Sequence, residues 1–162
     1  IYNILKKMNY LHELDLPNDF KDPKVLAVDT ETMGLNPHRD KLCLVQLSTG
    51  DENAHLVQLG GKLGYKSPKL ISVLKNKKIL KIFHYARFDV AIIKKNLGII
   101  PSPVFCTKIA SKLARTYTDR HGLRELCKEL LNVEISKQQQ SSDWGSEVLS
   151  KAQIKYASND VL

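Results

Sequence analysis

The sequence has few cysteines, few aromatic residues and no long apolar run. Its 162 residues include 3 Cys, an odd number without any C-x-x-C spacing, which argues against a disulfide framework and against a thiolate zinc site. A mean hydropathy of −0.26 without a long apolar run excludes a membrane-spanning helix. The chain starts without Met, shows no signal-peptide pattern, and has ends that resemble cut points. We therefore expect a soluble, cytoplasmic protein.

Acidic residues are the scarcer charged type. There are 17 Asp and Glu against 25 Lys and Arg, which leaves a formal net charge of +8 and a pI of about 9.4. A field of this sign attracts anions, and nucleic acid is the first partner to consider. The length and the 43% hydrophobic content are those of one globular domain, so we expect residues 1–162 to form a single domain.

Apolar and β-branched residues gather in short runs that lack helical periodicity. Runs of this kind, bounded by turn-forming residues, are typical of strands. We expect strands over residues 25–32, 41–48, 54–59, 79–84 and 104–106. Gly50 and Asp51 separate the second run from the third and predict an antiparallel hairpin there.

Helical signals alternate with the later strands. Ser67 followed by Pro68 predicts an N-cap and a first-turn proline of a helix that ends near residue 75. Helical spacing of apolar residues predicts further helices over residues 86–96, after Thr107, around residues 123–130, and from Ser150, where Gln153 completes a capping box. The order predicts an α/β fold with a mixed five-stranded sheet flanked by helices.

Two carboxylates stand two residues apart near the end of the first of these strands. Asp29 and Glu31 project to the same side of the strand, because side chains alternate along it. Their immediate neighbours supply no basic partner, so the pair is costly unless a cation lies between them. From this pair alone, metal binding and a solvated strand end are about equally favoured.

Three further residues complete an acidic pattern. Asp89 falls in the first turn of the helix after the fourth expected strand, where negative charge suits a helix start. Tyr156 and Asp160 are four apart, and hence on one face of the last helix. Each feature alone is ordinary. Their combination, with Asp89 60 residues after Asp29 and Asp160 71 residues after Asp89, is far more specific.

This combination resembles the DEDD superfamily of 3′-5′ exonucleases. The stretches VDTETMGL (residues 28–35), FHYARFDVAII (residues 83–93) and YASND (residues 156–160) look like its three motifs in order. A Tyr four residues before the last Asp is similar to the tyrosine branch of the superfamily, and the nearest likeness is to ribonuclease D. One departure is Cys106, which stands where many relatives of this type have an Asp.

The resemblance implies a ribonuclease H-like fold and a hydrolase that cleaves phosphodiester bonds from the 3′ end. Four carboxylates match the charge of two divalent cations, and oxygen ligands suit Mg²⁺ or Mn²⁺. By analogy Asp29 bridges both ions, Glu31 and Asp160 complete the site of the ion that holds the attacking water, and Asp89 supports the other ion. The Tyr156 hydroxyl then orients the water, because a Tyr pKa near ~10 makes a poor general base.

Weaker signals concern the substrate. By the resemblance, Thr32, Met33, Gly34 and Leu35 abut the terminal nucleotide, although an ordinary turn is the alternative. A run of basic residues at helical spacing could track a phosphate backbone, but a solvated helix face is the commoner explanation. The run comprises Lys108, Lys112, Arg115, Arg120, Arg124 and Lys128.

The sequence as a whole predicts a ribonuclease D-type 3′-5′ exoribonuclease. It would act with two divalent metal ions on the 3′ ends of single-stranded RNA and release nucleoside 5′-monophosphates. One alternative is a DNA 3′-5′ exonuclease similar to proofreading or Werner-type domains, since nothing in the motifs reads the 2′-hydroxyl unambiguously. The other is a non-catalytic nucleic-acid-binding domain on the same fold, against which the presence of all four acidic residues argues.

Overall fold

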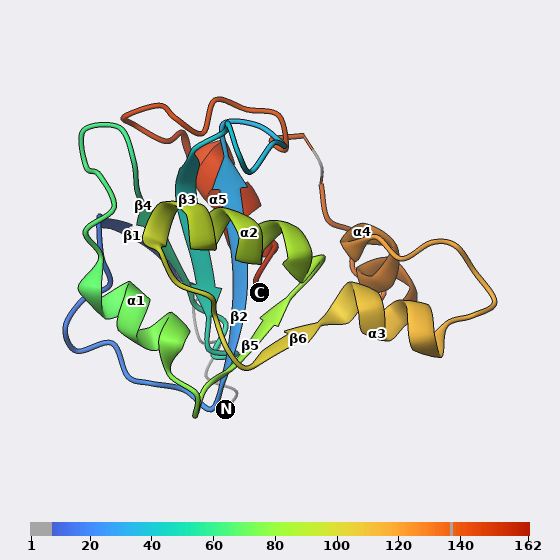
Figure 1. The fold of residues 1–162 in the computed structure, drawn as a ribbon. Coiled ribbons are helices and arrows are strands. Elements are labelled where there is room, and N and C mark those ends of the chain that lie inside the picture. Colours follow the sequence, from blue (N-terminus) through green and yellow to red (C-terminus); the bar gives the residue numbers. More distant parts are fainter. Residues whose placement is uncertain (1–7, 137) are drawn as a thin grey trace, which may run out of the picture.

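The computed structural model describes residues 8–136 and 138–162, which form a twisted sheet with helices on both faces (Figure 1). The sheet has six strands in the order β1-β4-β3-β2-β5-β6. Their bounds are β1 Asn9–Glu13, β2 Val25–Thr32, β3 Leu42–Ser48, β4 Ala54–Gln58, β5 Leu80–Phe83 and β6 Val104–Cys106.

The sheet is mixed, as expected, and one strand accounts for its mixed character. β3 pairs antiparallel with both β2 and β4, whereas the pairs β1·β4, β2·β5 and β5·β6 are parallel. The carboxyl ends of β2, β5 and β6 therefore lie at one edge of the sheet. Residues that follow these three strands are brought together there.

The number of strands differs from the sequence prediction, which gave five. The additional strand is β1, whose sequence NYLHE alternates between exposed and half-buried positions and never enters the core. It pairs only with β4 at the edge of the sheet, from Asn9 opposite Ala54 to Glu13 opposite Gln58. A short polar edge strand lacks the apolar run that identifies a buried strand, because the backbone pairing needs no apolar side chains.

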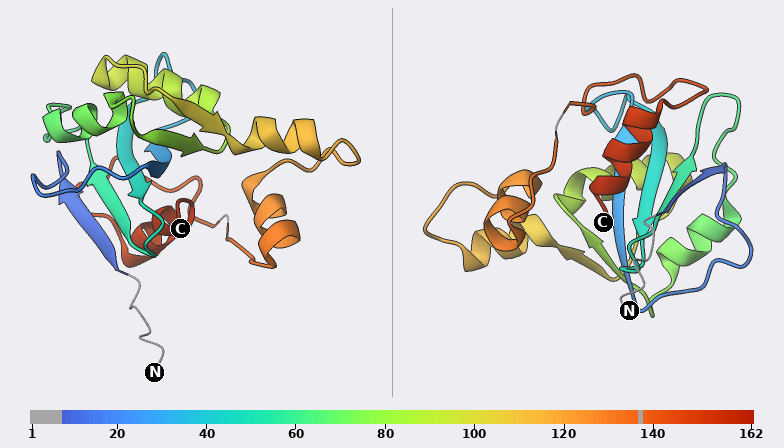
Figure 2. Two further views of the ribbon diagram at one scale, coloured as in Figure 1. Left: turned by 90° about the horizontal axis from the view of Figure 1, so that it is seen from below. Right: turned by 180° about the vertical axis from the view of Figure 1, so that it is seen from behind.

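Two cores cover the two faces of the sheet (Figures 1 and 2). On one face lie α1 (Pro68–Lys75) and α2 (Ala86–Leu97), whose buried residues pack with Leu26 and Val28 of β2 and with Val45 and Leu47 of β3. On the other lies α5 (Lys151–Asn159), where Ala157 packs with Trp144, Leu44 and Leu56. β3, buried at every position, separates the two cores.

The start of α1 differs from the prediction in its capping residue. Ser67 makes no side-chain cap, and its hydroxyl donates instead to the carbonyl of Leu14. The cap comes from Asp15, whose carboxylate accepts from the backbone N–H of Lys69 at 2.8 Å and of Leu70 at 2.7 Å. A sequence pattern can identify a capping residue only next to the helix, whereas this carboxylate lies more than fifty residues upstream.

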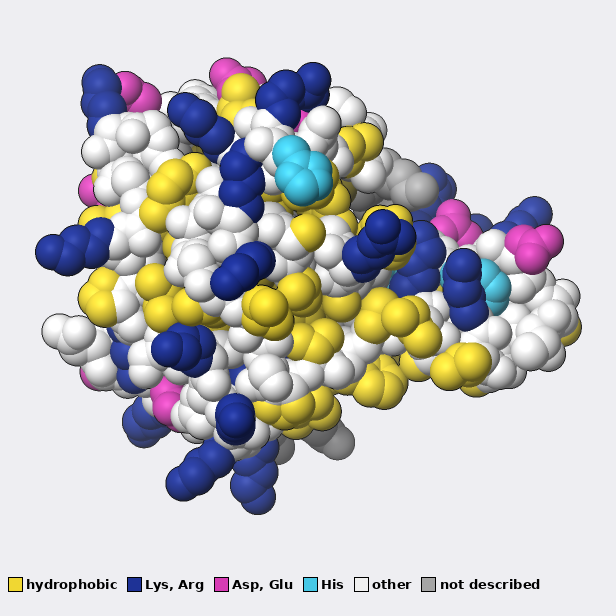
Figure 3. Space-filling model, viewed as in Figure 1, with side chains coloured by type: hydrophobic (Ala, Val, Ile, Leu, Met, Phe, Trp, Pro, Cys, Tyr) yellow, Lys and Arg dark blue, Asp and Glu magenta, His cyan; other side chains and the backbone are white. Residues whose placement is uncertain are grey.

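An arm projects from the β6 end of the sheet (Figure 2). It contains α3 (Thr107–Ala114), α4 (Leu123–Leu126) and the π-helix η1 (Cys127–Leu131). The helix expected after Thr107 is present as α3, but Ile109 and Leu113, the apolar residues on which its helical spacing rests, are 59% and 77% exposed. Figure 3 shows hydrophobic side chains on the surface of the arm and of the part of the molecule next to it.

The helix expected around residues 123–130 forms as α4 followed directly by the π-turns of η1.

No described helix is both long enough and apolar enough to cross a bilayer. Cys43, Cys106 and Cys127 are free thiols.

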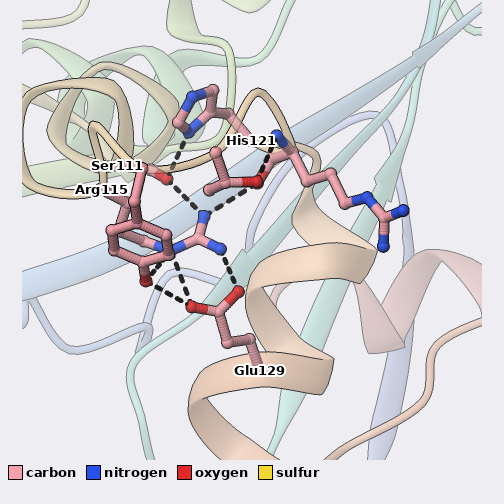
Figure 4. A network of polar contacts seen from close by, with 7 residues as sticks. Ser111, Arg115, His121 and Glu129 are labelled. Atoms are coloured by element: carbon pink, nitrogen blue, oxygen red, sulfur yellow. Dashed lines mark hydrogen bonds and ion pairs between the residues drawn. The ribbon is translucent and has the colours of Figure 1, made fainter.

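Arg115 does not fit either explanation of the basic run, phosphate contact or a solvated helix face, because both require an exposed side chain. It is only 6% exposed and anchors a polar network within the arm (Figure 4). Its guanidinium donates to the Ser111 hydroxyl at 2.9 Å and to the backbone carbonyl of Arg120 at 2.8 Å, and it forms an ion pair with Glu129. Ser111 is also hydrogen-bonded to His121, at 2.9 Å. The guanidinium is thus occupied by the arm itself and is not free for phosphate.

Replacing Arg115 by Met is expected to destabilise the fold by about 2–3 kcal/mol, because it leaves the polar groups of the network without their donor. Urea unfolding followed by circular dichroism measures this. Lys112→Met is the matched control, since Lys112 is an exposed residue of the same helix, and its effect should stay within about 0.5 kcal/mol. An Arg115→Met protein of unchanged stability and weakened RNA binding would restore the phosphate-contact interpretation.

Candidate active site

β2 carries two of the acidic residues to the carboxyl edge of the sheet. Asp29 and Glu31 share the α5 face of the strand, and Thr30 between them points to the α2 face. The pairing of β2 with β3 shifts between Glu31 and Thr32, which pair with Leu44 and Leu42. Such a bulge bends the strand where it leaves the sheet and re-aims the side chains beside it.

α5 brings Asp160 to the same place. Its start is fixed by the predicted capping box, which is confirmed: the Ser150 hydroxyl accepts from the N–H of Gln153 at 3.2 Å, and the Gln153 side chain accepts from the N–H of Ser150 at 2.9 Å. Asp160 is the C-cap of this helix. Asp29, Glu31 and Asp160 each offer a carboxylate oxygen, and these oxygens all lie within 4.8 Å of one another.

Asp89 approaches from the opposite face of the sheet. It lies in the first turn of α2, is 3% exposed, and accepts a hydrogen bond of 2.7 Å from the Thr30 hydroxyl. It is not one of the three residues whose oxygens share the 4.8 Å group. Its charge nevertheless acts on Asp29 and Glu31, since it helps raise the pKa of both. The four acidic residues therefore form one electrostatic unit.

The clustering raises the pKa of every carboxyl in the unit. Burial, followed by Asp160 and Asp89, raises the pKa of Glu31 to about 9. Burial and the other three carboxylates hold the pKa of Asp29 well above its usual range. Burial raises the pKa of Asp89 to about 7, and that of Asp160 to about 6, in each case against a lowering effect from a hydroxyl donor. Ionising all four at neutral pH is costly without added positive charge.

The donor set fits divalent cations. Among the ion pairs of residues 8–136 and 138–162, none involves any of these four carboxylates, so no Lys or Arg in this part of the chain pairs with them. Carboxylate oxygens are the ligands that Mg²⁺ and Mn²⁺ prefer. A cluster of this composition, partly buried and without a cationic partner, is chemically suited to hold such ions.

Tyr156 lies one helical turn before Asp160 and beside the cluster. Burial, then the charges of Asp160, Glu31 and Asp29, raise the pKa of its phenol above the ordinary value, so the hydroxyl keeps its proton at neutral pH. Its ring packs against Trp144, with the ring centroids 6.1 Å apart. Trp144 is 2% exposed and belongs to the core beneath α5, so its ring is not available to stack on a base.

The loop after β2 presents the predicted substrate-contact residues to solvent. Met33 is 54% and Leu35 85% exposed, and the Thr32 hydroxyl donates to the carbonyl of Gly34. Gly34 packs closely on Asp40, and a Cβ at this position would force the buried carboxylate of Asp40 to move. The structure thus holds an apolar loop at the rim of the acidic cluster.

A cavity of about 430 Å³ opens beside Met33, lined also by Trp144, Cys43 and the turn at Gly60 and Gly61. Its volume lies within the range of small-ligand sites. It lies on the β3 and β4 side of the loop that carries Met33.

Two further residues lie at the ends of β5 and β6. His84 follows β5, and its Nδ1 is 2.9 Å from the Thr107 hydroxyl, so this histidine is hydrogen-bonded within the protein. Cys106 ends β6, and backbone N–H groups at the starts of α2 and α3 outweigh its burial and lower the pKa of its thiol.

Two polar side chains at the cluster were missed from the sequence. Thr30 donates to Asp89, and Gln46 of β3 donates to Asp29. Thr30 gave no signal, because a β-branched residue is ordinary in a strand. Gln46 gave one: it is an amide in the middle of the otherwise apolar run LCLVQLS.

The sheet topology together with the acidic cluster defines a ribonuclease H-like exonuclease fold, and solved structures agree. The Escherichia coli RNase D structure matches with a TM-score of 0.73 and 26% identity, covering 86% of this chain and 36% of that one. The chain belongs to the 3′-5′ exonuclease family, whose model matches residues 11–162.

Higher identity is found with NrnC of Brucella melitensis. Its structure with bound Mg²⁺ has a TM-score of 0.89 and 55% identity, covering 95% of this chain and 75% of that one. Its structure bound to pGG has 56% identity, again with a TM-score of 0.89, covering 96% and 76% of the two chains.

Among curated proteins, Ribonuclease D of Acidiphilium cryptum is 35% identical over 84% of this chain and 34% of its own length. DNA polymerase I of Aquifex aeolicus is 36% identical over 85% of this chain and 22% of its own length. The chain thus spans about a third or less of the length of such relatives.

Proposed function

We propose that this chain is a metal-dependent 3′-5′ exoribonuclease that releases nucleoside 5′-monophosphates. The observation that carries the proposal is the convergence of Asp29, Glu31 and Asp160 within 4.8 Å, with Asp89 coupled to them. Membership of the 3′-5′ exonuclease family and the Mg²⁺ bound by Brucella NrnC support it. A purely structural cluster would need basic partners, and the described ion pairs provide none.

The four carboxylates would hold two divalent ions between them. Asp29, whose charge interacts with all three others, would contribute to both ions. Glu31 and Asp160 would complete one site, and Asp89 would support the other. When bound, the ions supply an activated water and neutralise the charge that develops on the departing 3′ oxygen.

Tyr156 acts in this scheme as a donor that positions the attacking water. Its raised pKa keeps the phenol protonated, so it is no general base at neutral pH. Its packing on Trp144 fixes the ring, and with it the direction of the hydroxyl.

The substrate we propose is the 3′ end of single-stranded RNA, short oligonucleotides included. Met33 and Leu35 offer exposed apolar side chains at the rim of the cluster, where a nucleobase can pack, and Thr32 and Gly34 shape the loop that carries them. The pGG bound by Brucella NrnC supports a short substrate for this chain.

A DNA 3′ end is the second candidate. It is favoured by the 36% identity to DNA polymerase I of Aquifex aeolicus. A direct comparison of the two sugars decides between them.

The test is a gel of 5′-labelled single-stranded RNA and DNA, of dinucleotide length and longer, incubated with the protein in Mg²⁺, Mn²⁺ or chelator. We expect RNA to shorten from the 3′ end only when metal is present. Shortening of DNA with intact RNA would support the second candidate. Strands that remain intact but shift on a native gel, with or without metal, would indicate a binding domain without turnover.

A further inference from the structure

Gln46 is a buried amide that contacts a single acidic residue. It lies in β3 opposite Asp29 of β2, is 0% exposed, and its Nε2 donates to Asp29 Oδ2 at 3.3 Å. In the ionised form that would bind a cation, the Asp29 carboxylate can only accept hydrogen bonds, and the NH₂ end of the amide faces it. No other side chain of residues 8–136 and 138–162 hydrogen-bonds the Asp29 carboxylate.

The rest of the amide has no polar partner. Its Oε1 is buried without a hydrogen bond. The side chain shares its strand face with Leu44, and its register partner on the other side is Leu56, both of which belong to the apolar cluster beneath α5. A buried acceptor without a partner costs about 1–3 kcal/mol. An apolar side chain of similar volume would suit the fold better than this amide does.

We propose that Gln46 is a positioning residue that holds the Asp29 carboxylate in the orientation required for metal binding. The inference rests on the proposed metal role of Asp29. The carboxylate oxygens of Asp29, Glu31 and Asp160 lie within 4.8 Å of one another, so like charges push the ionised Asp29 carboxylate away from the cluster. The donor from the neighbouring strand opposes that displacement, as partners of metal ligands commonly do. The amide is therefore retained for the metal site at a cost to the fold.

The experiment compares wild type with Gln46→Met, which keeps the volume and removes both polar atoms. Mn²⁺ is titrated into the metal-free full chain by isothermal titration calorimetry, and thermal unfolding of the metal-free protein is measured separately. We expect Mn²⁺ affinity to fall about tenfold or more. We expect the metal-free melting temperature to stay the same or rise, because the orphaned oxygen is gone.

Gln58→Met is the matched control. Gln58 is a buried amide of β4 whose Nε2 donates to the backbone carbonyls of Ser146 at 2.9 Å and Glu147 at 3.3 Å, and no hydrogen bond joins it to the four carboxylates. Its loss should lower the melting temperature and leave Mn²⁺ affinity within about twofold.

Two results would overturn the inference: Mn²⁺ affinity of Gln46→Met within twofold of wild type, or a fall in its melting temperature as large as that of Gln58→Met. Failure of the proposed function would look different. Wild type itself would then bind no Mn²⁺, or would bind it equally well after the Asp29→Asn substitution.

Discussion

Replacing Asp29 by Asn should reduce hydrolysis of labelled RNA about 10³-fold or more. The substitution keeps the shape of the side chain and removes the charge that interacts with all three other carboxylates. Bound metal ions are worth several kcal/mol to such a transition state, and about 4 kcal/mol corresponds to ~10³ in rate. The decay rate of full-length RNA in Mg²⁺ measures the loss.

The same substitution should make the metal-free protein more stable. One of four mutually repelling carboxyls becomes neutral, so the electrostatic cost of folding the cluster falls. Asp19→Asn is the control, because Asp19 is an exposed carboxylate of the loop between β1 and β2. It should change neither rate nor melting temperature. An Asp29→Asn protein that is inactive and also less stable would point to misfolding rather than to loss of a metal ligand.

Two pairings within the acidic cluster could be predicted from the sequence because their signals are local, whereas the grouping of all four acidic residues came from the family resemblance. Alternation along a strand places Asp29 and Glu31 on one side, and a four-residue step along a helix aligns Tyr156 with Asp160. The capping box at Ser150 was equally readable, since both of its partners lie within four residues.

The features that sequence reasoning missed depend on contacts between distant segments. β1 exists because β4 offers it an edge, and Asp15 caps α1 across more than fifty residues. Arg115 looked like part of a solvated basic face, and only the return of the chain through Glu129 makes it a buried anchor. Gln46 gains its meaning from the antiparallel register of β3 with β2. Periodicity contains no information about such pairings.

Metal binding should stabilise the protein, and by more as pH rises. The pKa of Glu31 is raised to about 9, that of Asp89 to about 7 and that of Asp160 to about 6, against ~4 in an unfolded chain. Between about pH 4 and pH 9 the metal-free folded protein therefore binds more protons than the unfolded chain does. Its stability is greatest at the acid end of this window and declines as pH rises through the folded pKa values.

Divalent ions oppose this decline, because they replace the protons that leave. Saturation at about 100 times the dissociation constant adds ~2.7 kcal/mol, or roughly 5–10 °C in melting temperature for a domain of this size. Melting curves at pH 5 to 9, in chelator and in Mn²⁺, should therefore diverge as pH rises, and those of Asp29→Asn should diverge much less. Parallel wild-type curves with and without Mn²⁺ would contradict the idea that the ion takes the place of protons on these carboxylates. Such a divergence would show that the same carboxylates have two effects: they destabilise the metal-free fold, and they form the site that a cation would bind.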